Sequence, residues 1–459
     1  MLTTSEVSAL IPDTLAGDLV SRTATAADRD AVVDLQGVAH VGPDGRASDS
    51  IKLWQRDLFD RPHPTVTLDD MMVVADRRTG DIVASLMIVP QVWSYARVSF
   101  GVGRPELAAT RPDYRGRGLM AHLMWSLAKR SEARGELVQA ASDFLHLTDQ
   151  MGYHMALPQR SGRGGRVADL PPAPADVEPV RLRPATMADV DVLARADERM
   201  RERVLLSCLR DEAQWRHEVA GRSPGNMVRD EVLIIEAPHG PVGYLAIGYG
   251  GIPTFPVPSW LPGQPCPEPV VSITSFELVS DVSWFDTAPS VLRQLATTTT
   301  DQERAPTSGF MLWLGSVHPA YAVVSDRLTR DSEQVGWFLR VPDLCAFLRR
   351  ISPVLERRLV GSPAESFTGD LKVDVYQEGL RLRFAAGRIL GIEPWDTPGR
   401  RRASDASLPR PMLLQLIFGQ GDWDSLAPAY PDCRMQNGMG RLLLPRLFPR
   451  QPSAIWPLT

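Results

Sequence analysis

A glycine-rich turn between an extended segment and an amphipathic helix constrains the fold of this 459-residue chain more than any other feature. The extended segment is Glu106 to Thr110, and the turn is Arg115-Gly116-Arg117-Gly118. The run that follows carries apolar residues at i, i+4 spacing, namely Leu119, Met120, Leu123, Met124 and Leu127, which predicts a helix with one apolar face. Such a turn directs consecutive backbone N–H groups and a helix N-terminus at one point, so it predicts a pyrophosphate site.

This arrangement resembles motif A of the GNAT acyltransferases, Arg/Gln-x-x-Gly-x-Gly/Ala. The match is Arg115-Gly116-Arg117-Gly118-Leu119-Met120, with Met120 in place of the small sixth residue. Large residues also occur there in the subgroup typified by the enhanced-intracellular-survival (Eis) acetyltransferases, and Met151-Gly152-Tyr153 downstream adds to the likeness. The resemblance implies an α+β fold with mixed sheets and a turn that binds acetyl-CoA.

A nine-residue segment occurs twice in the chain. Arg22 to Asp30 reads RTATAADRD, and Arg183 to Asp191 reads RPATMADVD. In each copy a short strand ends in Thr and Asp follows three residues later, which predicts a helix N-terminus of the capping-box type. GNAT domains typically begin this way, so the duplication predicts two tandem GNAT domains.

The repeat and a Pro-rich connector divide the chain. The connector Leu170-Pro171-Pro172-Ala173-Pro174-Ala175 places the first boundary, so residues 1–170 are predicted to form the GNAT domain with the acetyl-CoA site. Residues 171–350 are predicted to form a second, degenerate GNAT-like domain. There His318-Pro319-Ala320-Tyr321 stands where the phosphate turn is expected, and Gly336 to Pro342 looks like the middle domain of Eis-type proteins.

The pattern changes again from about residue 353. Alternating Leu371, Val373 and Val375 and alternating Leu380, Leu382 and Phe384 predict a hairpin with one buried face. Pro411 to Phe418 predicts an apolar helix. This layout resembles the sterol-carrier-protein-like α+β domain that ends Eis-type proteins, so residues 351–459 are predicted to be that domain and its C-terminal tail.

Composition excludes several classes of partner. Hydrophobic residues make up 44% of the chain and charged residues 23%, as in ordinary soluble globular proteins. The net charge of −5 gives no reason to expect nucleic acid or an anionic membrane as a partner. Four widely spaced cysteines predict no metal site, and the absence of a signal peptide or a long apolar run predicts a cytoplasmic protein.

The resemblance assigns the residues that contact acetyl-CoA. Arg115, Gly116, Arg117, Gly118 and Leu119 would hold the pyrophosphate. Ala108, Ala109 and Thr110 lie on a strand that in this family separates from its neighbour, pairs with the pantetheine arm and offers a backbone N–H to the oxyanion. Ser142 and Asp143 end the next strand, where family members line the cofactor arm.

The general acid departs from the family pattern. GNAT enzymes usually place a Tyr five residues before the aromatic residue of Gly-Phe or Gly-Tyr, and counting back from Tyr153 gives Thr148. A threonine hydroxyl is a poor proton donor. His146 lies two residues away and would share the site only if the segment is irregular, because i, i+2 side chains of a helix do not share a face.

Two carboxylates compete for the role of general base. In Eis enzymes the terminal carboxylate of the chain enters the active site and acts as the base. Here the chain ends Ser453-Ala454-Ile455-Trp456-Pro457-Leu458-Thr459, and its apolar residues predict a docked tail that presents the Thr459 carboxylate. Glu106, on the central strand, is the alternative base.

Three functions remain open from the sequence. The first is acetyl transfer to a small-molecule amine, for which the Eis resemblance implies aminoglycosides or other polyamines and a homo-hexamer. The second is decarboxylation of an acyl-CoA by Thr110 or Thr148 with His146, and the third is a non-catalytic CoA-binding sensor or scaffold. An acidic N-terminal pocket would support a polyamine substrate, and four aspartates lie in the expected segment: Asp57, Asp60, Asp69 and Asp70.

Overall fold

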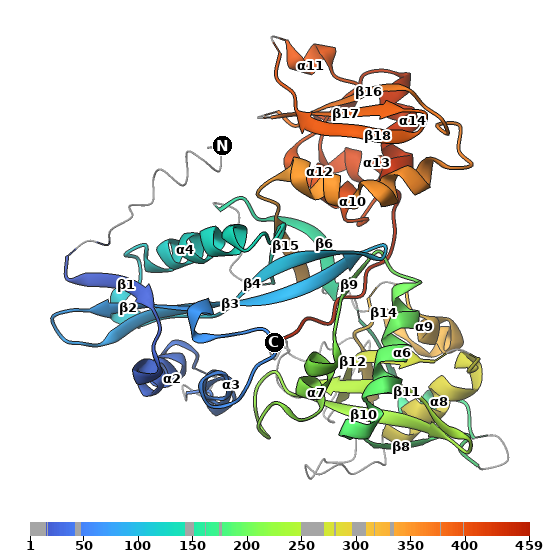
Figure 1. Cartoon of the computed structure of the whole chain (residues 1–459). Coiled ribbons are helices and arrows are strands. Elements are labelled where there is room, and N and C mark those ends of the chain that lie inside the picture. The colour runs from blue at the N-terminus through green and yellow to red at the C-terminus, as the bar shows by residue number, and fades with distance from the viewer. Residues whose placement is uncertain are drawn as a thin grey trace.

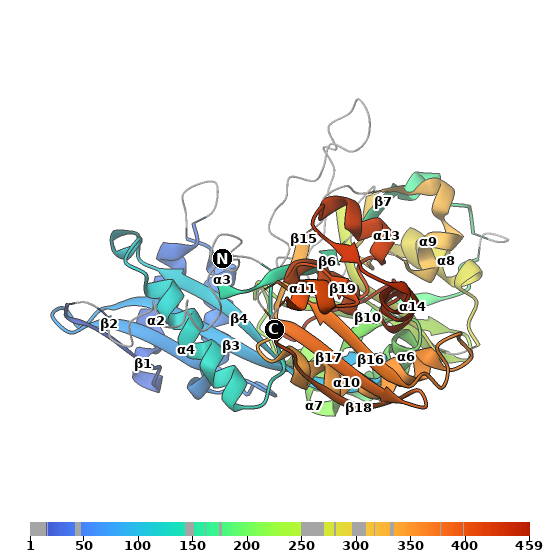
Figure 2. The same cartoon turned by 90° about the horizontal axis from the view of Figure 1, so that it is seen from above.

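The residues that the structure describes fold into three mixed β-sheets with helices packed against them (Figures 1 and 2). The computed structural model describes residues 15, 17–41, 47–142, 151–160, 162–173, 177–248, 270–279, 281–295, 309–315, 317–330, 335–376, 378–397 and 399–459. The mixed α/β class that the sequence predicts is confirmed. Figure 2, the view from above, shows the first sheet extending to one side of the other two.

The first sheet has the strand order β1-β2-β3-β4-β5-β15-β6, with β9 paired to β3. Its strands are β1 (Leu19–Thr23), β2 (Met71–Asp76), β3 (Ile82–Tyr95), β4 (Val98–Thr110), β5 (Val138–Ala141), β6 (His154–Arg160), β9 (Leu206–Cys208) and β15 (Val335–Arg340). Strands β1 to β4 are antiparallel neighbours, and β4 and β5 are parallel. Helices α2 (Arg29–Ala39) and α3 (Asp49–Asp60) cover one face, and α4 (Leu119–Ala133) covers the other (Figure 1).

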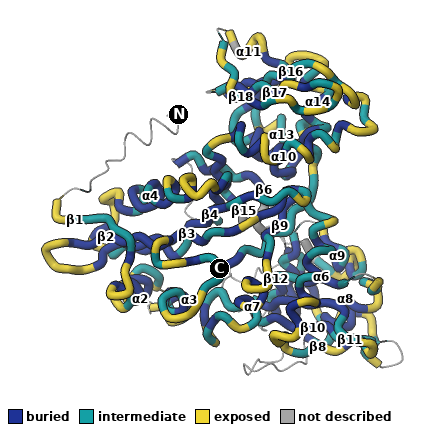
Figure 3. Tube along the Cα trace, viewed as in Figure 1, coloured by how far each residue is buried: buried dark blue, intermediate teal, exposed yellow. Residues whose placement is uncertain are grey.

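Helix α4 begins where the apolar periodicity predicts. Its residues Leu119, Leu123, Met124 and Leu127 are at most 3% exposed. They pack against Leu86 and other apolar side chains of the central strands, which Figure 3 shows as a largely buried layer. Burial of this stripe holds the glycine turn at the edge of the first sheet.

The second sheet has the order β14-β7-β13-β12-β11-β10-β8. Its strands are β7 (Arg163–Arg166), β8 (Arg181–Pro184), β10 (Asp230–Ala237), β11 (Gly240–Gly248), β12 (Val270–Leu278), β13 (Gly309–Leu312) and β14 (Thr329–Arg330). The helices of this part are α6 (Val190–Arg201), α7 (Glu212–Ala220), α8 (Trp284–Leu295) and α9 (Pro319–Val323). Strands β8, β10, β11 and β12 are antiparallel and β13 is parallel to β12, the same order of directions as β1 to β5.

The two copies of the repeated segment form the same helix cap. Thr25 and Asp28 make a capping box, and Thr186 and Asp189 make another. In each copy an arginine six residues before the aspartate pairs with it at 2.7 Å. The arginine and the threonine donors lower the pKa of Asp28 and of Asp189 to about 2. The predicted caps are therefore present, each with an additional ion pair.

The third sheet has the order β18-β17-β16-β19-β20, and the predicted hairpin is β16 (Gly369–Asp374) with β17 (Gly379–Ala385). Its other elements are α10 (Leu344–Leu359), β18 (Arg388–Pro394), α11 (Arg400–Ala403), β19 (Ala406–Ser407), α12 (Arg410–Ile417), α13 (Trp423–Leu426), β20 (Arg434–Met435) and α14 (Gly438–Leu447). Trp93 and Trp337 of the first sheet share one apolar cluster with Phe347 of α10 and Leu371 of β16. The first and third sheets therefore share a core.

Two strands cross the domain boundaries that the sequence predicts. Strand β7, before residue 170, pairs with β13 in the second sheet. Strand β15, before residue 350, lies between β5 and β6 in the first sheet. The division into residues 1–170, 171–350 and 351–459 stays a prediction. Across the ranges given above, no helix is long and apolar enough to span a membrane.

Candidate functional site

The glycine turn is exposed and needs its glycines for backbone conformation. Gly116 and Gly118 have φ angles of +75° and +76°, in the left-handed region that L residues seldom adopt. A Cβ atom on either residue would meet nothing within 4 Å, so space does not dictate glycine here. Gly118 is the N-cap of α4, and the N-terminal amides of that helix therefore open toward solvent beside the turn.

The arginines of the turn are exposed, while the aromatic residue beneath them is anchored. The Arg117 guanidinium lies 4.5 Å from the ring centroid of Tyr114 and donates a 3.0 Å hydrogen bond to the Asp113 carbonyl oxygen. The Tyr114 hydroxyl donates to Asp76 at 2.7 Å. Arg115 is exposed on the same turn. Positive charge is thus concentrated beside the N-terminus of α4.

Strand β4 changes its pairing with both neighbouring strands before it reaches the glycine turn. Its parallel pairing with β5 joins Val102 to Val138 and Gly103 to Gln139, although β4 continues to Thr110. The register with β3 shifts between Ser85 and Met87. Opposite this shift, Leu107 has a φ of +52°, and its carbonyl oxygen accepts a 2.8 Å hydrogen bond from Gln36.

The predicted oxyanion segment, Ala108 to Thr110, lies beyond the part of β4 that pairs with β5, although Ala109 and Thr110 still pair with β3. Ala108 and Ala109 are buried, and Thr110 ends the strand just before the turn. Ser142 follows the last residue of β5 and is half-buried. The two strands therefore diverge in the direction of the turn, which is the geometry the resemblance implies for an acyl-CoA arm.

Three predicted residues lie outside the described residues: Asp143, His146 and Thr148. Tyr153 is described and lies in the core, where its hydroxyl donates to Gln139 at 3.2 Å and burial raises its pKa. The identity of the general acid stays a prediction.

Glu106 is an ion-paired carboxylate rather than a solvated one. Its side chain is 14% exposed and pairs with Arg104, two residues earlier on β4. Another terminal nitrogen of Arg104 lies 3.4 Å from the carbonyl oxygen of Leu458. Arg104 therefore joins one predicted base, Glu106, to the tail that carries the other.

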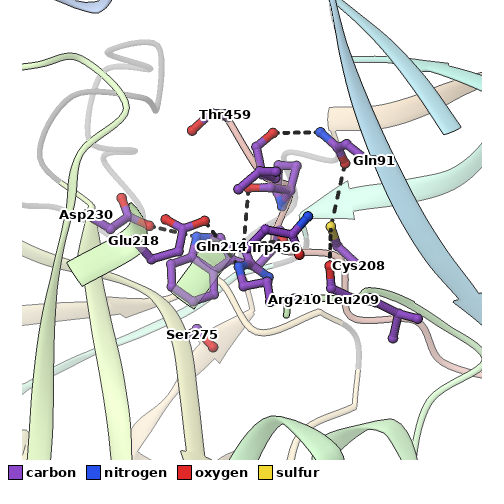
Figure 4. Close-up of polar contacts among 12 residues, drawn as sticks. Gln91, Cys208, Leu209, Arg210, Gln214, Glu218, Asp230, Ser275, Trp456 and Thr459 are labelled. Atoms are coloured by element: carbon purple, nitrogen blue, oxygen red, sulfur yellow. Dashed lines mark hydrogen bonds and ion pairs between the residues drawn. The ribbon is translucent and has the colours of Figure 1, made fainter. Parts of the chain in front are cut away.

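The C-terminal tail is docked between the first and second sheets (Figures 1 and 4). Leu458 is fully buried, and its carbonyl oxygen accepts a 2.6 Å hydrogen bond from Gln91 of β3. Arg222 donates to a main-chain oxygen of Thr459, from Nε at 3.1 Å, and to its hydroxyl at 3.0 Å. His63 Nε2 lies 3.4 Å from the same main-chain oxygen.

Three of the four aspartates in the segment expected to form an acidic pocket bind other protein groups. The Asp57 carboxylate accepts hydrogen bonds from Ser223 and Asn226 at 2.6–2.8 Å. Asp60 pairs with Arg29, and Asp70 is the N3 carboxylate of the Thr67 capping box. These three acids have protein partners, and an acidic substrate pocket stays a prediction.

The part of the chain that the structure describes contains no group of three or more His, Cys, Asp or Glu side chains placed to hold a metal ion. The side chains that hold the C-terminal tail carry no sequence motif: Arg222, Arg210, Gln91 and Arg104.

Comparison with known proteins agrees with this geometry. Residues 21–156, which span β1 to β5, the turn and α4, match the acetyltransferase (GNAT) domain family. No curated protein matches the sequence.

Solved structures share the fold over nearly the whole chain. A GCN5-related N-acetyltransferase from Kribbella flavida has 15% identity and a TM-score of 0.64, covering 96% of this chain and 98% of its own. One from Anabaena variabilis has 11% identity and a TM-score of 0.64, covering 95% and 99%. Eis1 from Mycobacterium abscessus has 15% identity and a TM-score of 0.58, covering 94% and 97%. The chain is thus an enzyme whose residues 21–156 match the acetyltransferase (GNAT) domain family.

Proposed function

We propose that this enzyme is an acetyl-CoA-dependent N-acetyltransferase that acts on an amine of a small molecule. The observation that carries the proposal is the exposed turn of Gly116 and Gly118 at the N-terminus of α4, beside a β4 strand that bulges at Leu107. An open helix N-terminus with two neighbouring arginines suits a pyrophosphate. Where the parallel strands β4 and β5 diverge, main-chain groups of β4 can pair with the pantetheine arm of acetyl-CoA.

The residues fit acetyl-CoA, which supplies an acetyl group activated as a thioester. Arg115 and Arg117 hold the pyrophosphate with the main-chain amides of Gly116, Gly118 and Leu119. Because these glycines have no Cβ, the backbone can approach the phosphates. A backbone N–H from the segment 108–110 donates to the thioester carbonyl oxygen, where negative charge develops during transfer. Ser142 lines the other side of the arm.

A base must take the proton that the acceptor nitrogen loses when it forms the amide. Glu106 and the Thr459 carboxylate are the two candidates, and both lie on the face of the first sheet that α2 and α3 cover. Thr148 or His146 would return a proton to the departing thiolate. The net reaction moves the acetyl group to nitrogen and releases one thiol.

The substrate class and the assembly extend the same proposal. From the resemblance to Eis enzymes the proposal also takes an aminoglycoside- or polyamine-like amine, a homo-hexamer and a sterol-carrier-protein-like third domain; the chain shares its fold with Eis1. The matching strand directions in the first and second sheets, and their matching caps, support tandem GNAT domains. The cytoplasmic location that the sequence predicts is also part of the proposal.

Release of the free thiol from acetyl-CoA tests the proposal with a panel of aminoglycosides and polyamines. We expect turnover with at least one amine. Acetyl-CoA binding without turnover would favour the sensor or scaffold, and conversion of malonyl-CoA to acetyl-CoA without an amine would favour the decarboxylase.

Two variants assign the base in the same assay. Glu106→Gln removes one carboxylate, and addition of a glycine after Thr459 displaces the other. The variant that alters the true base lowers kcat by about 100-fold. Glu212→Gln, on an exposed side chain of α7, is the control and keeps the parent rate.

A further inference from the structure

The second sheet opens in the same way as the first. Strand β12 pairs in parallel with β13 from Val270 to Ile273, and its register with β11 then shifts near Thr274. Beyond that point, Thr274 to Glu277 and Trp313 to Gly315 line one small cavity of about 40 Å³. By position this cavity corresponds to the parting of β4 and β5, where the first sheet is proposed to bind acetyl-CoA.

The chain's own tail passes along this cavity. Ser453, Ala454, Ile455 and Trp456 form part of its lining. The amide of Ala454 donates to Leu206 of β9 at 3.0 Å, so the tail is held through its main chain. A Cβ on Gly315, whose φ is +82°, would lie 3.0 Å from the Ser453 carbonyl oxygen. The tail therefore approaches the opening of the second sheet too closely for most side chains there.

Trp456 is the side-chain anchor of the tail (Figure 4). Its indole nitrogen donates to Asp230 at 2.9 Å, and its ring stacks on Tyr244 with centroids 6.3 Å apart. The Arg210 guanidinium lies 4.2 Å from the ring centroid and donates to the Trp456 carbonyl oxygen at 2.8 Å. All of these partners belong to the second sheet or to the segment that precedes α7.

A buried charge imbalance holds the end of the tail. Arg210 and Arg222 both pair with Glu218, at 3.1 Å and 2.7 Å, and the three side chains are at most 3% exposed. Two guanidinium groups and one carboxylate leave one positive charge, which is costly to bury without a partner. The Thr459 main-chain oxygen that Arg222 contacts places a partial negative charge beside these guanidinium groups.

The ionisable groups beside Arg210, Arg222 and Glu218 do not change the net charge of this cluster. Burial, followed by the charge of Arg222, lowers the pKa of His63 to about 4 and that of His217 to about 3, so both rings are neutral near pH 7. Asp197, which also lines the cavity, pairs with Arg201 at 3.2 Å.

We propose that the second sheet, with its helices, is a docking module for the chain's own C-terminal tail and that Arg222 is the residue that positions the Thr459 carboxylate. The module occupies its acyl-CoA-like opening with the tail and presents Leu458 and Thr459 to the first sheet. There Gln91 and Arg104 bind the Leu458 carbonyl oxygen. This assignment rests on the proposed function only where it concerns the rate of acetyl transfer.

Digestion of the full-length protein with a carboxypeptidase tests the docking without any activity assay. Release of Thr459, followed by mass spectrometry, reports how often the tail leaves its site. We expect Arg222→Met to accelerate release by at least about tenfold, because it removes a buried charge partner of the carboxylate. Arg216→Met is the matched control, since Arg216 lies on α7 in an exposed pair with Glu212 and should leave the rate unchanged.

Further variants keep the result interpretable if Arg222→Met folds poorly. Trp456→Phe keeps an aromatic ring but loses the bond to Asp230, and it should also accelerate release. Arg222→Lys restores the charge without the two-nitrogen contact and should restore part of the protection. Thermal unfolding by circular dichroism identifies any variant that is globally unfolded.

The kinetic readout separates the docking module from the proposed function. If the parent acetylates an amine, Arg222→Met should lower kcat while the KM for acetyl-CoA stays constant. If the parent acetylates nothing but its tail protection depends on Arg222, the acetyltransferase proposal fails and the docking module stands. If Arg222→Met, Trp456→Phe and Arg216→Met all release Thr459 at the parent rate, the docking assignment is wrong whatever the activity.

Discussion

The side-chain amide of Gln91 donates a 2.6 Å hydrogen bond to the carbonyl oxygen of Leu458, 367 positions away in the sequence. The same amide group accepts from the indole nitrogen of Trp93 at 2.9 Å, so both of its ends are used in a buried setting. One side chain of β3 thus connects the central strand of the first sheet to the last two residues of the chain. The placement of Thr459 depends on this connection.

Gln91→Leu should lower the free energy of unfolding by about 1–3 kcal/mol, because it leaves buried polar groups of Trp93 and Leu458 without their partner. Chemical denaturation measures the change. Gln436→Leu, on an exposed side chain near β20, is the control and should lie within about 0.5 kcal/mol of the parent. A Gln91→Leu protein as stable as the parent would show that the tail contact contributes nothing.

Gly118→Ala should have two separable effects. The φ of +76° costs an L residue about 1 kcal/mol of stability, and the new Cβ would stand where the phosphates are expected. Gly80, in the turn between β2 and β3, has a φ of +81° and the same free space. Gly80→Ala should therefore lose similar stability but keep its affinity for acetyl-CoA. Equal affinity in both variants would argue against phosphate binding at the turn.

Stability should decrease as the pH falls below about 6.5, the pKa of an unfolded histidine. The pKa of His63 is lowered to about 4, by burial and then by Arg222, so between these values the unfolded chain binds a proton that the folded chain does not. His217, at about 3, acts in the same direction. Asp197 acts in the opposite direction, because burial raises its pKa to about 6 and favours folding as it takes up a proton.

Comparison of the parent with His63→Gln isolates this effect. Denaturation curves between about pH 7 and pH 5 should show a smaller loss of stability in the variant, since glutamine does not titrate. Parallel curves for the two proteins would contradict the lowered pKa of His63.

The two helix caps should respond alike to loss of their aspartates. Asp28→Ala and Asp189→Ala each remove a capping carboxylate and an arginine partner, and each should cost about 1–2 kcal/mol of unfolding free energy. Asp191→Ala, on an exposed side chain of α6, serves as the control. A large cost at only one of the two caps would contradict their equivalence. Amide hydrogen exchange can assign each loss to its own sheet.

Sequence patterns predict the elements whose signals are local. The extended segment expected at Glu106 to Thr110 forms the end of β4, the helix expected after Gly118 is α4, and both caps form at their Thr residues. These signals depend on periodicity and on contacts within four residues, which a single sequence contains.

Contacts between segments that are distant in the sequence cannot be predicted from such local signals. Glu212 and Arg216 form an exposed i, i+4 pair, while Glu218 and Arg222 have the same spacing and are buried. Burial depends on a tail more than 200 positions later, which no local pattern records. In the same way, nothing within Val335–Arg340 indicates that it inserts between β5 and β6.

A calorimetric titration of the protein with acetyl-CoA tests the central claim most directly. We expect binding in about the micromolar range and a loss of affinity of about tenfold or more in Arg115→Ala, because a charge-assisted contact to the pyrophosphate is removed. Arg216→Ala, on an exposed arginine of α7 in the second part of the chain, should bind as the parent does. Absence of binding in the parent, or equal binding in Arg115→Ala, would contradict a cofactor site at the glycine turn.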